Sequence, residues 1–374
     1  MAPEPPPLGV FLRYFLRLGA LGFGGPIALA GYMQRDLVER RRWIAPQDYV
    51  EGLALAQLAP GPLAAQLAIY LGWIRTGVLG ATLVGVAFVL PSFAMVLVIS
   101  ALYVRWGGLP WMQGVFYGVG AAVIAIIGRS AYKLVRLTLG RDALLWAIFV
   151  VTAMVTIRTE SEVVWLFVGG GIVALVVRLL PQAALALTPL FVTGVHGPAS
   201  RATLWTIGWY FAEAGAFVFG SGLAIVPFLY GGVVDRFHWL TERQFLDAVA
   251  VAMITPGPVV ITTAFIGYLV AGPLGASVAA LGVFLPCWLF VIVPAPYFRR
   301  FAGNPAVKAF VAGVTAAATG AIAGAAVVLG RRAIVDVPTA AIALATLALL
   351  TWARRIPEPL VIVAAGIVGL VIAR

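Results

Sequence analysis

Residues 53–66 read Leu-Ala-Leu-Ala-Gln-Leu-Ala-Pro-Gly-Pro-Leu-Ala-Ala-Gln, and residues 249–262 read Val-Ala-Val-Ala-Met-Ile-Thr-Pro-Gly-Pro-Val-Val-Ile-Thr. Both stretches place Pro-Gly-Pro inside a long apolar segment. Each proline removes a backbone N–H donor and clashes with the preceding turn, so neither segment forms one unbroken helix. Within a membrane, such a break is tolerated only inside protein or beside a water-filled cavity. The two breaks therefore predict two broken helices that face a common site, although bends needed only for packing stay an alternative.

The composition around these stretches is that of a membrane protein. Of the 374 residues, 62% are apolar and 10% are charged, whereas soluble domains carry about 25% charged residues. The apolar segments are roughly as long as the 17–25 residues that a helix needs to cross a bilayer. The alternating pattern of a transmembrane barrel is absent from them. We therefore predict an all-α polytopic membrane protein and exclude a soluble enzyme, a disordered chain and a collagen-like fibre.

The chain also repeats itself at an interval of 196 residues, which becomes 195 after a one-residue deletion. The matched pairs include Gly19-Ala20 with Gly215-Ala216, Trp43 with Trp239, Pro60-Gly61-Pro62 with Pro256-Gly257-Pro258, and Leu90-Pro91 with Leu285-Pro286. Composition alone does not maintain one register over so long a stretch, and internal duplication is typical of transporters. We predict a first transporter repeat over 1–180, a linker over 181–201 and a second transporter repeat over 202–374.

The charged residues bear on how the halves are oriented. Lys and Arg number 25 against 14 Asp and Glu, a net charge of +11, and the basic residues lie mainly between apolar segments. If the segments near 49–73 and 245–270 enter and leave on one side, each half crosses five times and most loop Lys and Arg gather on one side. The positive-inside rule makes that side cytoplasmic. We therefore expect inverted repeats with about ten crossings and two broken or re-entrant segments.

The small number of cysteine and histidine residues and the arrangement of the basic residues argue against several other functions. A single cysteine, Cys287, and two isolated histidines, His196 and His238, predict no metal site and no cofactor. They also leave no side-chain set for an intramembrane enzyme. A polar face that combines clustered Lys and Arg with aromatic residues is absent, so we expect no nucleic-acid partner.

The breaks and the glycine-rich stretches supply the candidate substrate-binding residues. The N–H groups that begin a half-helix attract anions. Successive glycines can cradle an anion with their N–H groups, or can merely let helices pack closely. The candidate residues are Gly24, Gly25, Pro60, Gly61, Pro62, Gln66, Gly220, Ser221, Gly222, Pro256, Gly257 and Pro258.

Three carboxylates are candidates for proton coupling, because an acid inside a membrane is costly and suggests a proton relay. Glu51 and Asp247 lie nine residues before the two breaks, and Glu213 lies in an apolar context with Arg17 as its repeat partner. Glu213 and Arg17 could pair across the repeat axis. The alternative for Glu51 and Asp247 is a wet position at a helix mouth, where a carboxylate also suits the helix dipole.

The Arg-rich loop at 35–43 contains Arg41 and Arg42 immediately before Trp43. These arginines are typical of a topology anchor beside an interfacial tryptophan. Alternatively, Arg41 and Arg42 line an entrance at which electrostatic focusing concentrates an anion.

Together, these motifs resemble those of the chromate ion transporter family. In the first half the resemblance rests on Phe23-Gly24-Gly25-Pro26, Arg41-Arg42-Trp43, the stretch 53–66 and Phe88-Val89-Leu90-Pro91-Ser92. In the second half it rests on Phe219-Gly220-Ser221-Gly222, Pro256-Gly257-Pro258, Phe265-Ile266-Gly267-Tyr268 and Phe284-Leu285-Pro286.

The resemblance implies a secondary active transporter in the bacterial or archaeal inner membrane that exports chromate, using the proton motive force. Its expected partners are a small inorganic anion, protons and the lipid bilayer, and a homodimer stays open. The chain departs from the family's usual polar residues at Leu29, Leu223, Gly232 and Met253. The alternative is therefore a transporter or channel for another anion, such as sulfate, or for a small metabolite on the same duplicated scaffold.

Overall fold

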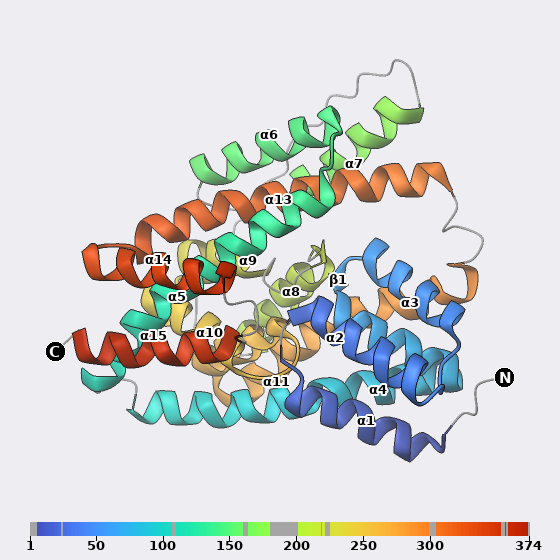
Figure 1. The fold of residues 1–374 in the computed structure, drawn as a ribbon, viewed down its shortest axis with the longest axis horizontal. Coiled ribbons are helices and arrows are strands. Elements are labelled where there is room, and N and C mark those ends of the chain that lie inside the picture. Colours follow the sequence, from blue (N-terminus) through green and yellow to red (C-terminus); the bar gives the residue numbers. More distant parts are fainter. Residues whose placement is uncertain are drawn as a thin grey trace.

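The computed structural model describes residues 6–23, 25–106, 110–159, 164–179, 201–217, 219–220, 225–298, 304–352, 356 and 358–372. These residues are helical almost throughout, as Figure 1 shows, which confirms the predicted helical class. The only strands among them are two of two residues each. The predicted linker at 181–201 lies outside the described residues except for Arg201, and the predicted repeat boundaries remain predictions.

The first half contains α1 (Leu8–Leu21), α2 (Gly25–Met33), the π-helix η1 (Gln34–Arg40), α3 (Pro46–Leu58), β1 (Gly61–Pro62), α4 (Leu63–Trp106), α5 (Pro110–Thr138), α6 (Ala143–Thr159) and α7 (Val164–Leu179). The second half contains α8 (Arg201–Phe217), β2 (Phe219–Gly220), α9 (Ile225–Tyr230), η3 (Gly231–Arg236), α10 (Glu242–Ile254), η4 (Val259–Ile261), α11 (Thr262–Ile292), η5 (Ala295–Tyr297), α13 (Pro305–Ala333), α14 (Val337–Trp352) and α15 (Glu358–Ile372). The expected Arg-rich loop at 35–43 is thus mostly the helix η1.

The duplication is present in the hydrogen bonds as well as in the sequence. The Tyr14 hydroxyl donates to the carbonyl oxygen of Tyr32, and 196 residues later the Tyr210 hydroxyl donates to the carbonyl oxygen of Phe228. The backbone N–H groups of Trp43 and Trp239 each donate, over 2.8 Å, to a carbonyl oxygen six residues earlier. Matched bonds of this kind show that both halves fold in the same way locally.

The long helix α4 contains a turn at Thr76 and Gly77, where φ of Gly77 is +62°. A Cβ atom on Gly72 would lie 2.4 Å from the Gly80 carbonyl oxygen and 2.8 Å from Cβ of Val84. In a continuous helix, residues 72 and 84 would be about 18 Å apart. The stretches 63–75 and 78–106 are therefore separate helices that fold back on each other.

The second half repeats this turn inside α11, at Ala271 and Gly272, with φ of Gly272 at +61°. A Cβ atom on Gly267 would lie 2.3 Å from the carbonyl oxygen of Gly275, the same contact as in the first half. The separation of apolar segments after 73 and after 270 in the sequence agrees with these turns.

The Pro-Gly-Pro break at 60–62 forms a second fold-back. A Cβ atom on Gly52 of α3 would lie 2.3 Å from Cδ1 of Tyr70, which is on the far side of the break. The break is therefore the tip of a helical hairpin, the shape expected of a re-entrant segment. Among the described residues, four helical segments are long and apolar enough to cross a membrane, namely those at Leu63–Trp106, Gly114–Lys133, Val259–Tyr297 and Pro305–Arg331. The ten crossings and the inverted orientation remain predictions.

The outer helices of the two halves interlock. In Figure 1, α13 of the second half lies along α6 and α7 of the first, while α5 of the first half lies against α14 and α15. A Cβ atom on Gly118 would lie 2.0 Å from the carbonyl oxygen of Ala365, and one on Gly313 would lie 2.2 Å from that of Gly170. Glycines at these matched points let the helix backbones approach closely, so each half completes the packing of the other.

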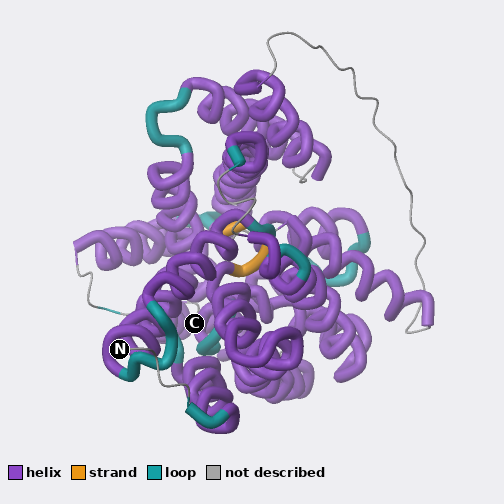
Figure 2. Tube along the Cα trace, turned by 90° about the vertical axis from the view of Figure 1, so that its right-hand side faces the viewer, coloured by secondary structure: helices purple, strands orange, loops and turns teal. Residues whose placement is uncertain are grey.

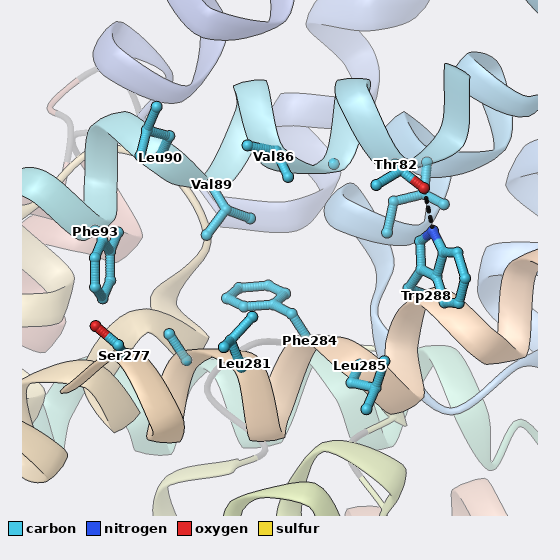
Figure 3. A pocket seen from close by; sticks show the side chains of 13 residues that line it. Thr82, Val86, Val89, Leu90, Phe93, Ser277, Leu281, Phe284, Leu285 and Trp288 are labelled. Carbon is cyan, nitrogen blue, oxygen red and sulfur yellow. Dashed lines mark hydrogen bonds between the residues drawn. The ribbon is translucent and has the colours of Figure 1, made fainter. Parts of the chain in front are cut away.

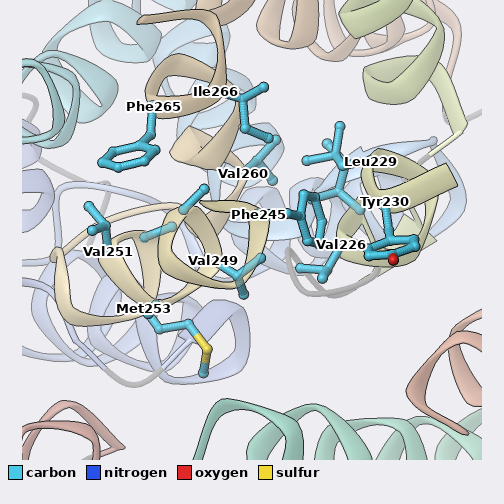
Figure 4. Close-up of a cluster of buried hydrophobic side chains, with 14 of the residues drawn as sticks. Val226, Leu229, Tyr230, Phe245, Val249, Val251, Met253, Val260, Phe265 and Ile266 are labelled. Carbon is cyan, nitrogen blue, oxygen red and sulfur yellow. The ribbon is translucent and has the colours of Figure 1, made fainter. Parts of the chain in front are cut away.

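The core lies where these central helices meet. Figure 4 shows part of the largest cluster of buried side chains, in which Phe245 of α10 packs near Leu229 and Tyr230 of α9. Beside the core, α4 and α11 face each other across the apolar groove in Figure 3, where the Trp288 ring N–H donates to the Thr82 hydroxyl over 3.1 Å. Leu281 in this groove is 70% exposed, as expected of a surface that faces lipid.

We predict that Gly19→Ala destabilises the protein, because a Cβ atom there would lie 2.1 Å from the carbonyl oxygen of Phe88. Since this neighbour is backbone, α1 and α4 must move apart, at a cost of roughly 1–3 kcal/mol. Thermal unfolding in detergent measures the effect. The control is Gly9→Ala on the same helix, where the new Cβ atom meets nothing within 4 Å. Equal unfolding temperatures for the two variants would contradict the packing of α1 on α4.

Candidate functional site

The two Pro-Gly-Pro breaks meet near the centre of the molecule. Figure 2 shows the strands β1 and β2 side by side among the surrounding helices. They pair in parallel, with Gly61 opposite Phe219 and Pro62 opposite Gly220. Because β2 follows the first helix of the second half, the break of one half is held by the other half.

The second break is held in the mirrored way. The Gly257 N–H donates to the carbonyl oxygen of Gly22, which follows the first helix of the first half, over 3.0 Å. The Ser92 hydroxyl lies 2.7 Å from the carbonyl oxygen of Pro256 and 3.3 Å from that of Gly19. The backbone at this Pro-Gly-Pro break cannot form regular helical hydrogen bonds, so its groups hydrogen-bond to the other half of the chain instead.

A small cavity lies between the breaks. Its lining residues come from both halves and are Pro26, Leu29, Pro62, Ala64, Gly257, Pro258 and Val259. Its volume of about 10 Å³ is room for about one water molecule. The start of α4 and the start of η4 both abut this cavity, and Pro62 and Pro258 lie one position before them. A tetrahedral oxyanion needs more space, so the structure holds this centre closed.

Gln66 is the polar side chain beside the first break. It is fully buried, and its Nε2 donates to the carbonyl oxygen of Pro60 over 2.6 Å. Its Oε1 is buried with no hydrogen-bond partner among the described residues. Leaving a buried polar atom unpaired costs about 1–3 kcal/mol, and such atoms in native structures call for an explanation. A side chain that turns to meet a ligand when the centre opens is one such explanation.

The candidate residues from the sequence divide into four groups. Pro62, Gly257 and Pro258 line the central cavity directly. Pro60, Gly61, Gln66, Gly220 and Pro256 take part in the contacts that build it, and Gly25 begins α2. Gly24, Ser221 and Gly222 lie outside the described residues. The sequence reasoning missed Pro26 and Leu29 as lining residues, although they directly follow the glycine-rich stretch that it singled out.

The matched acids Glu51 and Asp247 have different surroundings. Asp247 is 4% exposed, and its Oδ2 accepts a hydrogen bond of 2.7 Å from the Tyr103 hydroxyl of the other half. Glu51 is partly exposed, and its Oε1 accepts a hydrogen bond of 3.3 Å from Gln47. The position at a wet helix mouth, left open for both acids, suits Glu51 but not Asp247.

The pair that Arg17 and Glu213 could form across the repeat axis is not present in the described structure. No ion pair joins them in the part of the chain that the structure covers. Arg17 is exposed and lines an open pocket with Arg40 and Arg41 of its own half. The physical reason is that Arg17 faces this open, exposed pocket of its own half rather than the second half.

Arg41 and Arg42 also differ from each other. The Arg41 guanidinium lies 4.5 Å from the centre of the Trp43 ring and 5.6 Å from that of Tyr14, in cation–π geometry. Arg42 is exposed, lies two residues after the end of η1 with φ at +54°, and does not line this pocket. Of the two arginines, only Arg41 is placed to meet an anion that enters there.

A comparison with known protein families finds the same duplication, because one family model matches the chain twice. The family model described as chromate transporter matches residues 10–175 and again 205–370. The chain is 62% identical to the chromate transport protein of Cupriavidus metallidurans over 368 residues, which cover 96% of this chain and 92% of that protein. It is 58% identical to a probable chromate transport protein of Synechococcus elongatus, over 96% of this chain and 94% of that one. The chromate transport protein of Pseudomonas aeruginosa is 32% identical over 98% of this chain and 93% of that protein. No solved structure matches.

Proposed function

The chain belongs to the chromate transporter family, which makes it a membrane transporter rather than an enzyme, and from this premise we propose that it exports chromate across the bacterial inner membrane, driven by the proton motive force. The observation that carries the proposal is the meeting of both Pro-Gly-Pro breaks at one central cavity. Transporters of duplicated architecture bind their cargo at such broken helices, between the repeats.

The central cavity suits a small anion once it opens. The N-terminal end of α4 abuts it from one half, and η4, a single 3₁₀ turn that runs directly into α11, abuts it from the other. The N-terminus of a long helix favours negative charge. Gln66 is close enough to the first break to hydrogen-bond Pro60. When the breaks separate, its amide N–H groups are free to donate to an oxyanion in place of the Pro60 carbonyl oxygen. Fixed N–H donors of this kind would replace the water that the anion loses.

Opening the cavity means changing contacts between the halves. The contacts that hold it shut are the short pairing of β1 with β2, the bond from Gly257 to Gly22 and the bond from Ser92 to Pro256. These are few and join one half to the other. A rocking of one repeat against the other would exchange them, which is the usual form of alternating access.

Asp247 is the acid that we propose as the proton carrier. It is buried, it lies on the helix that leads into the second break, and its partner Tyr103 belongs to the other half. A proton on Asp247 turns its carboxyl group into a donor as well as an acceptor. Protonation would thereby alter a contact between the halves, which is what coupling requires.

The test is uptake of labelled chromate and labelled sulfate into proteoliposomes, with and without an imposed pH gradient. We expect chromate to accumulate only with the gradient and only in liposomes that contain the protein, and excess sulfate to compete weakly. Movement of chromate that ignores the pH gradient would instead indicate a channel. Accumulation of sulfate alone would indicate that this chain carries another tetrahedral dianion.

A further inference from the structure

One open pocket lies outside the central site, between α1 and η1. Its charged lining residues are Arg17 of α1, Asp36 and Arg40 of η1, and Arg41, which gives three positive charges and one negative charge, a net charge of +2. Its volume is about 600 Å³, which is ample for a hydrated anion. We call this pocket the basic vestibule.

The charges of the basic vestibule are only partly neutralised from within. Arg40 lies 3.7 Å from Asp36, and the side chain of Arg40 is 71% exposed. Arg41 contacts the faces of Trp43 and Tyr14 rather than a carboxylate. Arg17 has no ion pair among the described residues, and apart from Arg13 it is the only charged residue of the mostly apolar helix α1. An arginine on a membrane helix usually faces a water-filled cavity or the bundle interior, and the basic vestibule is that cavity.

Gly22 connects the basic vestibule to the central site. Gly22 lines the basic vestibule, and the carbonyl oxygen of Gly22 accepts the N–H of Gly257, which lines the central cavity. An anion held in the basic vestibule is therefore separated from the centre by the contacts that must change when the centre opens.

The corresponding positions in the second half carry no net positive charge. At the interval of 196 residues, Arg17 corresponds to Glu213, Asp36 to Gly232, and Arg41 to Phe237. Arg236 remains, so the charges at these positions cancel. Phe237 stacks on Trp239, with ring centres 4.5 Å apart and planes at 13°. The aromatic ring takes the place of the guanidinium that stacks on Trp43, without its charge.

We propose that the basic vestibule binds a tetrahedral, doubly charged oxyanion before this anion reaches the central site. This capture operates at one mouth of the transporter only. Arg17 and Arg41 bind the anion, because two positive charges on one aqueous pocket raise the local concentration of a dianion. The proposal deepens the proposed function and rests on it for the identity of the anion. It adds a functional difference between two repeats that otherwise fold alike, because the anion is captured by the first repeat only.

The first test compares the double variant Arg17→Gln/Arg41→Gln with Arg13→Gln, which removes a charge from an exposed position of helix α1 outside the basic vestibule. Chromate transport is measured in right-side-out and in everted membrane vesicles. We expect KM to rise about tenfold in one vesicle orientation only, with a smaller change in maximal rate, and no change for Arg13→Gln. A KM that changes equally in both orientations, or no more than in Arg13→Gln, overturns the proposal.

The second test does not depend on transport. The purified full-length protein is treated with phenylglyoxal, which modifies arginine, in sodium chromate or in sodium chloride of equal ionic strength, and the modified peptides are identified by mass spectrometry. We expect chromate to protect Arg17 and Arg41 at least about fivefold relative to Arg13, consistent with direct anion contact. Protection in a protein that moves no chromate would leave capture standing and reject the proposed function. Transport without protection would reject capture and leave the proposed function standing.

Discussion

Gly257→Ala is expected to abolish chromate transport and to destabilise the folded protein. Gly257 has φ at +101°, a conformation that residues with a Cβ atom rarely adopt. The new Cβ atom would also lie 1.9 Å from the Ser92 hydroxyl oxygen and 3.3 Å from the carbonyl oxygen of Gly19. Backbone strain and overpacking each cost about 1–3 kcal/mol. Transport in proteoliposomes and thermal unfolding in detergent measure the two effects.

Two further variants separate strain from the clash. Gly272→Ala places alanine at a similar positive φ of +61°, but its Cβ atom meets nothing within 4 Å. It should therefore lose about half of the stability that Gly257→Ala loses, because it carries the backbone strain without the overpacking. Adding Ser92→Ala to Gly257→Ala removes the closest contact and should restore part of the stability. Wild-type transport by Gly257→Ala, or no recovery in the double variant, would contradict the packing of the second break against Ser92.

Asp247→Asn is expected to abolish chromate accumulation driven by a pH gradient. Asparagine keeps the size of the side chain and an oxygen that can accept the Tyr103 hydroxyl, so the fold should survive. It cannot take up or release a proton, so a step that needs one stops. Accumulation of labelled chromate under an imposed gradient measures the loss, and the residual accumulation should not exceed that of liposomes without the protein.

The matched control is Glu51→Gln, the same chemical change at the repeat-related acid. Glu51 is partly exposed and hydrogen-bonded to Gln47, so this variant should transport nearly as well as the wild type. Exchange of chromate across liposomes without a gradient gives the second readout. Asp247→Asn should retain this exchange, because exchange does not require net proton movement. Gradient-driven accumulation by Asp247→Asn, or its loss in Glu51→Gln alone, would contradict the role proposed for Asp247.

The features that depend on local chain chemistry were predictable. Pro-Gly-Pro cannot continue a helix, so both breaks lie where the sequence places them. The glycines at 77 and 272 adopt positive φ, and the apolar segments separate there as expected. The duplication was visible because matched residues keep one interval over the region that contains the breaks, and the matched hydrogen bonds of Tyr14 and Tyr210 follow it.

The partners of these features were not predictable in the same way. The bonds from Ser92 to Pro256 and from Tyr103 to Asp247 join residues 164 and 144 positions apart. In a membrane helix nearly every face is apolar, so hydrophobic periodicity does not tell a buried face from one that contacts lipid. The expected pairing of Arg17 with Glu213 failed for the related reason that sequence matching does not show which cavity a side chain meets.

The sequence by itself therefore determined the helical membrane class, the duplication and the positions of the breaks, because proline, glycine and long apolar runs act on the chain within a few residues. Only the tertiary structure decided that each break is held by the opposite half, that Asp247 rather than Glu51 is buried, and that three arginines share one pocket. These outcomes depend on how two interlocked halves pack, and packing over such separations is set by the shapes of whole helices rather than by any local pattern.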